Sequence, residues 1–169
     1  MTEKHLLFVC LGNICRSPSA EAVMKHKIEK EGLEDLIKCD SAGIIGIHAG
    51  EPADARMRRH ATRRGYNLTS ISRQVKRGVD FDHFDLIIGM DDQNITDLKK
   101  LARNETDKKK IYRMTDFCKQ FDYETVPDPY YGGDAGFELV LDLLEDACEG
   151  LVEHLKSMGQ GARGMGQGT

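Results

Sequence analysis

Residues 9–18, Val-Cys-Leu-Gly-Asn-Ile-Cys-Arg-Ser-Pro, decide the fold of this chain. The apolar run before them, Leu6 to Val9, predicts a buried strand, while Ser17 and Pro18 are typical of the N-cap and the first position of a helix. Gly12 and Asn13 can both adopt positive φ, which predicts a short, tight turn between strand and helix. In such a turn, backbone N–H groups and the helix N-terminus form a site for a phosphate-sized anion.

The same turn holds a cysteine and an arginine, Cys10 and Arg16. A helix N-terminus and a guanidinium both favour the thiolate form of a nearby cysteine, and the guanidinium can hold two oxygens of a phosphoryl group. Cys10 could instead be an ordinary buried cysteine at the end of a strand. It is, however, the one cysteine of five with arginine six residues later, so the sequence favours a nucleophile in an anion site.

Composition indicates one domain and excludes several classes of protein. The 169 residues, 40% hydrophobic and 31% charged, suffice for one core, and the net charge of −4 argues against nucleic-acid binding. The six-residue apolar run Leu6–Leu11 is too short for a signal peptide or a membrane span. We therefore expect no membrane partner, and five cysteines without a secretion signal favour a cytoplasmic location. No cysteine or histidine spacing suggests a metal site.

Strand and helix signals alternate along the chain. Such alternation predicts an α/β fold with a single parallel four-stranded sheet and helices on both faces. The predicted strands are 6–9, 36–42, 84–90 and 110–114, and the predicted helices are 20–28, 53–64, 95–102 and 137–155. We interpret the arginines of 53–64 as a solvated face rather than a phosphate-binding patch. Residues 1–156 form the predicted domain, and the glycine-rich segment 157–169 is expected to be a disordered tail.

Four polar side chains follow or end the predicted strands: Cys10, Ser41, Asp91 and Asp128. Because ligands of open α/β sheets bind at the carboxyl ends of the strands, all four are expected on one rim. Asp128 stands between two prolines, which restrict its loop and can position a carboxylic acid. Such an acid can protonate the leaving oxygen of a phosphate ester.

These segments, together with Asp40-Ser41-Ala42-Gly43 and residues 127–132, Pro-Asp-Pro-Tyr-Tyr-Gly, resemble the low-molecular-weight protein tyrosine phosphatases in the same order along the chain. The resemblance implies a flavodoxin-like sheet of strand order 2-1-3-4. It also implies hydrolysis of phosphotyrosine and aryl phosphate monoesters through a phosphocysteine intermediate, without metal or cofactor. It assigns Cys10 as nucleophile, Asp128 as general acid and Arg16 as phosphate ligand. The phosphate-binding loop would comprise Leu11, Gly12, Asn13, Ile14, Cys15, Arg16 and Ser17. Partners would be phosphotyrosine proteins or peptides, with phosphate and vanadate as inhibitors.

The family pattern also implies supporting roles. Asn13, Ser17 and Ser41 would hold the loop open, and Asp91 would orient Arg16. Cys15 would protect Cys10 through a reversible disulfide. Eukaryotic members steady the loop asparagine with a histidine where this chain has Ser70. The cleft would be lined by Leu11, Tyr130, Tyr131 and Ile47, the last standing where many members have an aromatic residue.

Two alternatives remain open at this point. An arsenate reductase shares this fold and loop but needs two further thiols near the site, whereas Cys39, Cys118 and Cys148 are widely spaced. A non-catalytic phosphate-binding module would keep the loop and lose the nucleophile or the acid. Cys10, Arg16 and Asp128 are all present.

Overall fold

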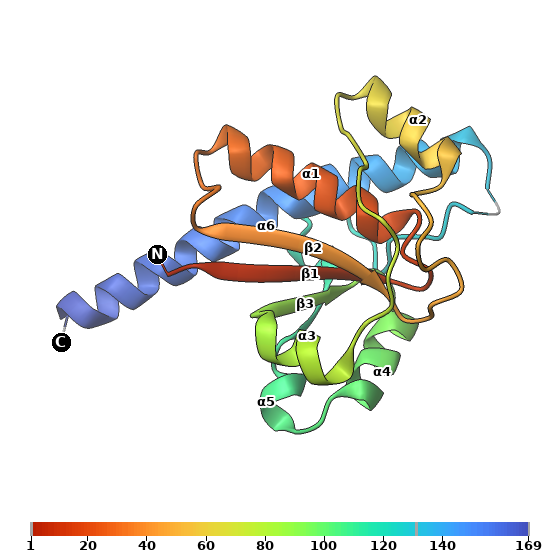
Figure 1. The fold of residues 1–169 in the computed structure, drawn as a ribbon. Coiled ribbons are helices and arrows are strands. Elements are labelled where there is room, and N and C mark those ends of the chain that lie inside the picture. The colour runs from red at the N-terminus through yellow and green to blue at the C-terminus, as the bar shows by residue number, and fades with distance from the viewer. Residues whose placement is uncertain (1, 131, 169) are drawn as a thin grey trace.

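Four parallel strands form the centre of the molecule in our computed structural model, which describes residues 2–130 and 132–168, with side chains as far as residue 158. The strands are β1 (Lys4–Cys10), β2 (Ile37–Gly43), β3 (Leu86–Gly89) and β4 (Ile111–Arg113), in the order β2-β1-β3-β4 (Figure 1). The predicted fold class and strand order are confirmed. β1 pairs with two strands, and Cys10 at its end lies opposite Gly43.

Helices cover both faces of the sheet (Figure 1). One face carries α1 (Arg16–Lys30), α2 (Ala55–Arg63) and α6 (Asp134–Gly168). The other carries α3 (Arg77–His83), α4 (Asp92–Leu101) and α5 (Glu105–Lys108), and the 3₁₀ helix η1 (Met114–Phe117) follows β4. Within the described chain, no helix has the length and apolarity to cross a membrane.

The alternation of side chains along β1 separates two cores. Leu6 and Phe8 pack with residues of α1 and α6, whereas Leu7 and Val9 pack with Phe81 and other residues on the opposite face. Successive side chains of a strand point to opposite faces of the sheet, so a continuous apolar run is what a doubly covered central strand requires. This burial on both faces holds the end of β1, where Cys10 lies, in a fixed position.

Helix α1 begins earlier than the sequence predicts. Cys15 is its N-cap, and no side chain caps it, so the prediction of Ser17 as N-cap and Pro18 as first residue is wrong. The reason is that the Ser17 hydroxyl bonds within the loop, to Cys10 and Asn13. Pro18 is the third helical residue, where its missing N–H still costs no hydrogen bond because the first turn has no intrahelical acceptors.

Helix α6 begins at Asp134 and continues through Gly168, so it includes residues 157–168 of the glycine-rich segment. The segment contains no proline, and a helix already nucleated extends at a cost of about 1 kcal/mol per glycine relative to alanine.

Candidate active site

Other segments of the chain hold the loop between β1 and α1 by donating hydrogen bonds to its carbonyl groups. Ile44 and Ile45 donate backbone hydrogen bonds to the carbonyls of Cys10 and Leu11, both at 3.0 Å. The Ser72 hydroxyl donates to the Gly12 carbonyl at 3.0 Å, and the Asp54 N–H donates to Ile14 at 2.8 Å. By contrast, no backbone N–H of residues 11–15 donates to any described residue. Unpaired N–H groups in a tight loop form an anion nest.

Asn13 and two glycines allow the loop its close turns. Asn13 has a φ of 58°, so of the two residues that can adopt positive φ it is Asn13 and not Gly12 that does so. Gly12 leaves room for the His48 ring, because a Cβ at this position would lie 3.0 Å from Cδ2 of His48. Similarly, a Cβ on Gly43 would lie 3.0 Å from the Leu11 carbonyl oxygen. Both glycines let neighbouring segments approach the loop.

A chain of hydrogen bonds leads from Cys10 to the back of the loop. The Cys10 Sγ lies 3.0 Å from the Ser17 Oγ, which accepts a hydrogen bond of 2.8 Å from Asn13 Nδ2. The Oδ1 of Asn13 accepts from the backbone N–H of Arg73 at 3.0 Å, which fixes the orientation of the amide. Because the Ser17 Oγ accepts a hydrogen bond from Asn13, its own O–H is available to donate to the Cys10 sulfur.

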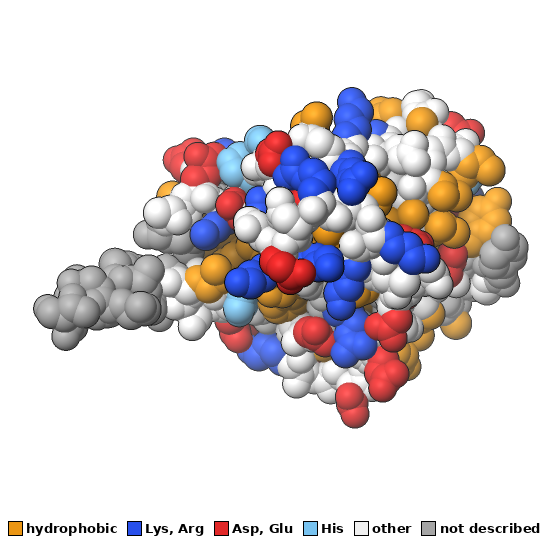
Figure 2. Space-filling view, turned by 90° about the horizontal axis from the view of Figure 1, so that it is seen from below, with side chains coloured by type: hydrophobic (Ala, Val, Ile, Leu, Met, Phe, Trp, Pro, Cys, Tyr) orange, Lys and Arg blue, Asp and Glu red, His pale blue; other side chains and the backbone are white. Residues whose placement is uncertain are grey.

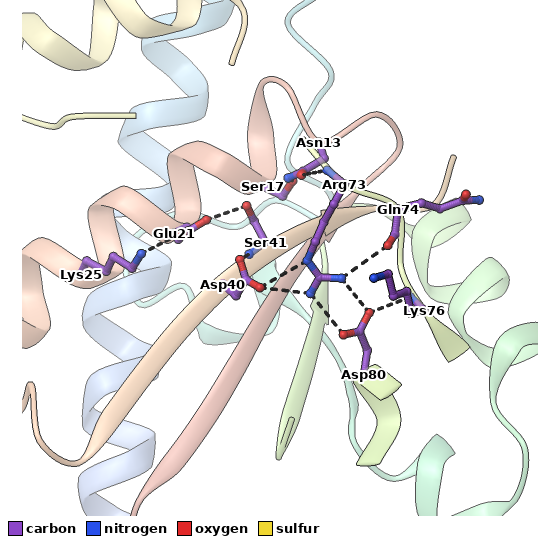
Figure 3. Close-up of polar contacts among 10 residues, drawn as sticks. All are labelled: Asn13, Ser17, Glu21, Lys25, Asp40, Ser41, Arg73, Gln74, Lys76 and Asp80. Atoms are coloured by element: carbon purple, nitrogen blue, oxygen red, sulfur yellow. Dashed lines mark hydrogen bonds and ion pairs between the residues drawn. The ribbon is translucent and has the colours of Figure 1, made fainter. Parts of the chain in front are cut away.

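Charged side chains fix Arg73 behind the loop (Figure 3). Its guanidinium donates to Asp40 at 3.1 Å and to the buried Asp80 at 3.0 Å. In the same view the buried Glu21 accepts from Ser41 and Lys25, both at 2.6 Å. The segment that holds Asn13 is therefore itself tied to β2 and α3.

Arg16 is buried and held along one edge of its guanidinium. Its Nη1 donates to Asp91 at 2.7 Å and to the Val126 carbonyl at 3.0 Å. The other carboxylate oxygen of Asp91 caps α4, accepting from the Asn94 N–H at 2.7 Å. Nη2 of Arg16 lies 3.9 Å from Oδ2 of Asp128. A guanidinium held at one nitrogen can present the remaining two to a phosphoryl group.

Asp128 lies on the loop that leads into α6, with 42% of its side chain exposed. The backbone N–H of Tyr130 donates to Oδ1 of Asp128 at 3.0 Å. Arg56 of α2 donates to the Tyr130 carbonyl at 3.1 Å. The carboxylate thus has one oxygen bonded within its own loop and the other facing Arg16.

A cavity of about 340 Å³ opens above the loop. Its lining combines the thiol, the guanidinium, the carboxylate and an apolar rim: Cys10, Leu11, Gly12, Ile14, Cys15, Arg16, Ile45, Ile47, His48, Asp128 and Tyr130. Four of these are exposed hydrophobic residues, Leu11, Ile45, Ile47 and Tyr130. Seen from below, hydrophobic side chains gather at the end of the molecule opposite the C-terminal end of α6, beyond the mixed charges of the α3 to α5 face (Figure 2).

The structure brings together most of the predicted site. Cys10, Arg16, Asp128 and the cleft residues Leu11, Ile47 and Tyr130 line one cavity, and Asp91 contacts Arg16 from outside it. Ser41 is placed differently, because β2 continues to Gly43, so Ser41 lies within the strand and bonds Glu21. The expectation that it ends the strand is wrong. Tyr131 lies outside the described residues.

The five cysteines differ in their surroundings. Burial, and then the negative charges of Asp54 and Cys10, raise the pKa of Cys15 above its usual range, which keeps it a neutral thiol. Cys148 is buried against Ala20, and Cys118 contacts the Leu143 carbonyl. Cys10 and Cys15 are the thiols among the described lining residues. In the part of the chain described, no group of three or more His, Cys, Asp and Glu side chains could hold a metal ion.

Several residues of the site carry no local sequence signal. Ser72 and Arg73 contact the loop from 60 residues away, and Arg56 reaches Tyr130 across 74 residues. His48 stands beside Ile47 in the cavity, where its Nδ1 lies 2.6 Å from the Glu51 carboxylate. In the sequence, only neighbouring positions mark two of these residues. His48 lies two residues before Gly50, a turn position with positive φ, and Arg56 lies two residues after Asp54, the N-cap of α2.

A parallel sheet whose first strand ends in a thiol, within an anion nest that a buried arginine closes, defines an oxyanion-binding α/β protein of the Cys-x5-Arg type. The family model described as low molecular weight phosphotyrosine protein phosphatase matches residues 5–161. The chain belongs to this family, and the prediction of an enzyme of this class is confirmed.

Relatives in bacteria and animals agree with this assignment. A putative low molecular weight protein-tyrosine-phosphatase of Synechocystis is 47% identical over 152 residues, which cover 89% of this chain and 95% of the relative. The human low molecular weight phosphotyrosine protein phosphatase is 36% identical over 151 residues, 89% and 94% of the two chains.

Solved structures share the fold. A protein tyrosine phosphatase of Entamoeba histolytica, crystallised with Hepes in the active site, matches with a TM-score of 0.90 and 49% identity, over 93% of this chain and 99% of that one. A Drosophila arginine phosphatase matches with a TM-score of 0.83 and 32% identity, over 89% and 97%.

Proposed function

We propose that this enzyme hydrolyses phosphotyrosine and other aryl phosphate monoesters through a phosphocysteine intermediate. The observation that carries the proposal is the loop of residues 11–15, whose N–H groups are unpaired while its carbonyls are bonded outward, with Cys10 and Arg16 lining the same cavity. N–H donors that have no acceptor and lie beside a thiol can bind the three equatorial oxygens of a phosphoryl group that the thiol attacks.

In the first step the Cys10 thiolate attacks phosphorus, and the S–P bond forms as the bond to the leaving oxygen breaks. Ser17 stabilises the thiolate at 3.0 Å, and Arg16 and the loop N–H groups bind the equatorial oxygens. Asp128, near Arg16 at the opening of the cavity, donates its proton to the leaving phenolate.

In the second step Asp128, now ionised, removes a proton from water as the water attacks phosphorus. The S–P bond breaks, inorganic phosphate leaves, and the thiolate returns. Neither step requires a metal ion or an organic cofactor. We also propose a cytoplasmic location, and protection of the thiolate by a reversible Cys10–Cys15 disulfide formed with peroxide as oxidant. A crosslinked peptide of the two cysteines after mild peroxide treatment tests the latter.

Two other functions fit the fold less well. An arsenate reductase of this fold would need thiols beyond Cys10 and Cys15 at the cavity, and the described lining offers none. A non-catalytic module would not need Asp128 beside Arg16. The Drosophila relative named an arginine phosphatase makes phosphoarginine a further substrate to compare.

The proposal is tested with a series of aryl phosphates that differ in leaving-group pKa, with and without a metal chelator, alongside an arsenate reduction assay. We expect chelator-insensitive hydrolysis and no arsenate turnover. Asp128→Asn should lower kcat/KM for phenyl phosphate by about 10² to 10³-fold and spare esters with good leaving groups, which need no proton. Equal losses across the series would disprove the acid assignment, and arsenate turnover would favour the reductase.

Ile47 offers a test of the proposed substrate cleft. Its side chain is 74% exposed at the cavity, so a larger ring there can reach the phenyl group of a substrate. We expect Ile47→Trp to lower KM for a phosphotyrosine peptide by up to about tenfold, roughly 1.4 kcal/mol, through ring stacking. KM for a small alkyl phosphate should barely change. Val79→Trp, at an exposed position of α3, is the matched control. An unchanged ratio of the two substrates' kcat/KM would remove Ile47 from the cleft.

A further inference from the structure

The start of α2 touches both loops of the active site. The backbone N–H of Asp54, the N-cap of α2, donates to the Ile14 carbonyl of the phosphate loop at 2.8 Å. Its carboxylate accepts from the N–H groups of Arg56 and Met57 at 2.9 and 3.2 Å. The helix terminus is therefore fixed to the phosphate loop through the backbone.

Arg56 carries this connection to the acid loop. Its Nε and Nη2 each lie 3.3 Å from an oxygen of Asp54, and Nη2 also donates to the Tyr130 carbonyl at 3.1 Å. The guanidinium carbon lies 5.3 Å from the ring centroid of Tyr130 and 5.0 Å from that of Phe137 at the start of α6. A planar cation that bonds a carbonyl and stacks on two rings fixes the loop in more than one direction.

Tyr130 completes the connection to Asp128. Arg56 contacts the carbonyl and the ring of Tyr130. The N–H of Tyr130 in turn donates to Oδ1 of Asp128 at 3.0 Å. Asp128 is nearly half exposed, and its other oxygen is 3.9 Å from Arg16, beyond hydrogen-bond distance. Its position over the phosphate loop thus depends on its own loop being held in place.

The other arginines of α2 make no such connection. Arg64, the C-cap of α2, pairs with Glu138, Asp142 and Glu145 of α6. The side chain of Arg59 is exposed and forms no ion pair or hydrogen bond with any described residue. Burial alone would raise the pKa of Asp54, yet the Arg56 guanidinium and the Met57 N–H hold that pKa below its usual range. The partner of Arg56 is consequently charged throughout the neutral range.

We propose that Arg56 is a positioning residue for catalysis, which joins the phosphate loop to the acid loop and holds Asp128 where it can protonate the leaving oxygen. The inference rests on the proposed function, because it assumes that Asp128 is the general acid. Arg56 does not line the cavity, and it acts through Tyr130.

The experiment compares Arg56→Gln and Arg56→Lys with Arg59→Gln, an exposed arginine of the same helix. kcat/KM is measured for phenyl phosphate and for 2,4-dinitrophenyl phosphate. We expect Arg56→Gln to lower the first by about tenfold and the second by less than about twofold, since an acid displaced from its position matters only for a poor leaving group. Arg56→Lys should fall between, because an ammonium lacks the planar fork. Arg59→Gln should match the wild type.

A double variant separates positioning from general damage. In the Asp128→Asn background, Arg56→Gln should cause less than about a twofold further loss, because its effect passes through the acid. The inhibition constant of phosphate should stay within about twofold of the wild type in every Arg56 variant, because the phosphate loop is intact.

The outcomes are distinct. Equal losses for both esters, or a full further loss in the Asp128→Asn background, would overturn the role of Arg56 while leaving the enzyme's activity and the acid assignment in place. A wild type that hydrolyses neither ester, or whose leaving-group dependence does not change in Asp128→Asn, would instead overturn the proposed function.

Discussion

Cys10→Ser is expected to lower the turnover of aryl phosphates by at least about 10⁴-fold while phosphate still binds. A serine hydroxyl stays protonated at neutral pH and is a much weaker nucleophile than a thiolate. The covalent phosphoenzyme intermediate therefore does not form at a useful rate. The N–H groups of residues 11–15 and the guanidinium of Arg16 do not depend on the sulfur, and a hydroxyl can still bond Ser17. Steady-state kinetics and calorimetric titration with phosphate measure the two properties.

Cys39→Ser is the matched control for this change. Cys39 lies on β2, is partly buried and does not line the cavity. Its replacement should leave kcat/KM near the wild-type value. Substantial hydrolysis by Cys10→Ser would falsify the nucleophile assignment, and loss of phosphate binding would show that the loop collapses without the thiol.

Arg16→Lys is expected to lower kcat/KM by about 10³-fold, although the charge is conserved. Arg16 uses Nη1 for Asp91 and Val126 and has the rest of its fork for the phosphoryl oxygens. A lysine has one nitrogen, so it can serve Asp91 or the substrate but not both.

The phosphate inhibition constant and the melting temperature separate two causes of this loss. Weaker phosphate binding in a protein of unchanged melting temperature is the expected pattern. Arg59→Lys, on the exposed face of α2, should leave kcat/KM and the phosphate inhibition constant unchanged. Near-normal kcat/KM for Arg16→Lys would show that a point charge suffices and that the bidentate contact is unnecessary.

The fold could be predicted largely from apolar periodicity. The runs of β1 and β3 and the long apolar stripe of α6 are visible as patterns. Their observed boundaries differ from the predicted ones by a few residues, except that α6 ends at Gly168 and not at residue 155. Helices α3 and α5 were not predicted, because seven and four residues are too few to show a helical period. Asp80 is a buried polar residue of α3 and makes the apolar pattern of this helix weaker still. Its hydrogen bonds from Arg73 and from the Lys76 N–H explain its burial.

The site could be predicted where topology determines it. The carboxyl ends of β1 and β3 and the loop after β4 and η1 bring Cys10, Asp91 and Asp128 together, as the rule for parallel sheets requires. Contacts between distant segments, such as those of Arg73 and Arg56, follow from no local pattern. The arginines of α2 and of its C-cap illustrate this limit. Arg59 is exposed to solvent, whereas Arg56 and the C-cap Arg64 form ion pairs.

Because the N–H groups of the loop are unpaired, we expect the free energy of unfolding of this enzyme to depend on the anions in its buffer. Donors held apart without acceptors favour any oxyanion that fits, and a ligand at 100 times its Kd stabilises the folded state by about 2.7 kcal/mol. The sulfonate Hepes occupies the active site of the Entamoeba relative, so common buffer anions are candidates to compete with substrate. Melting temperatures and inhibition constants of this enzyme are therefore comparable only between samples in which the anion and its concentration are the same.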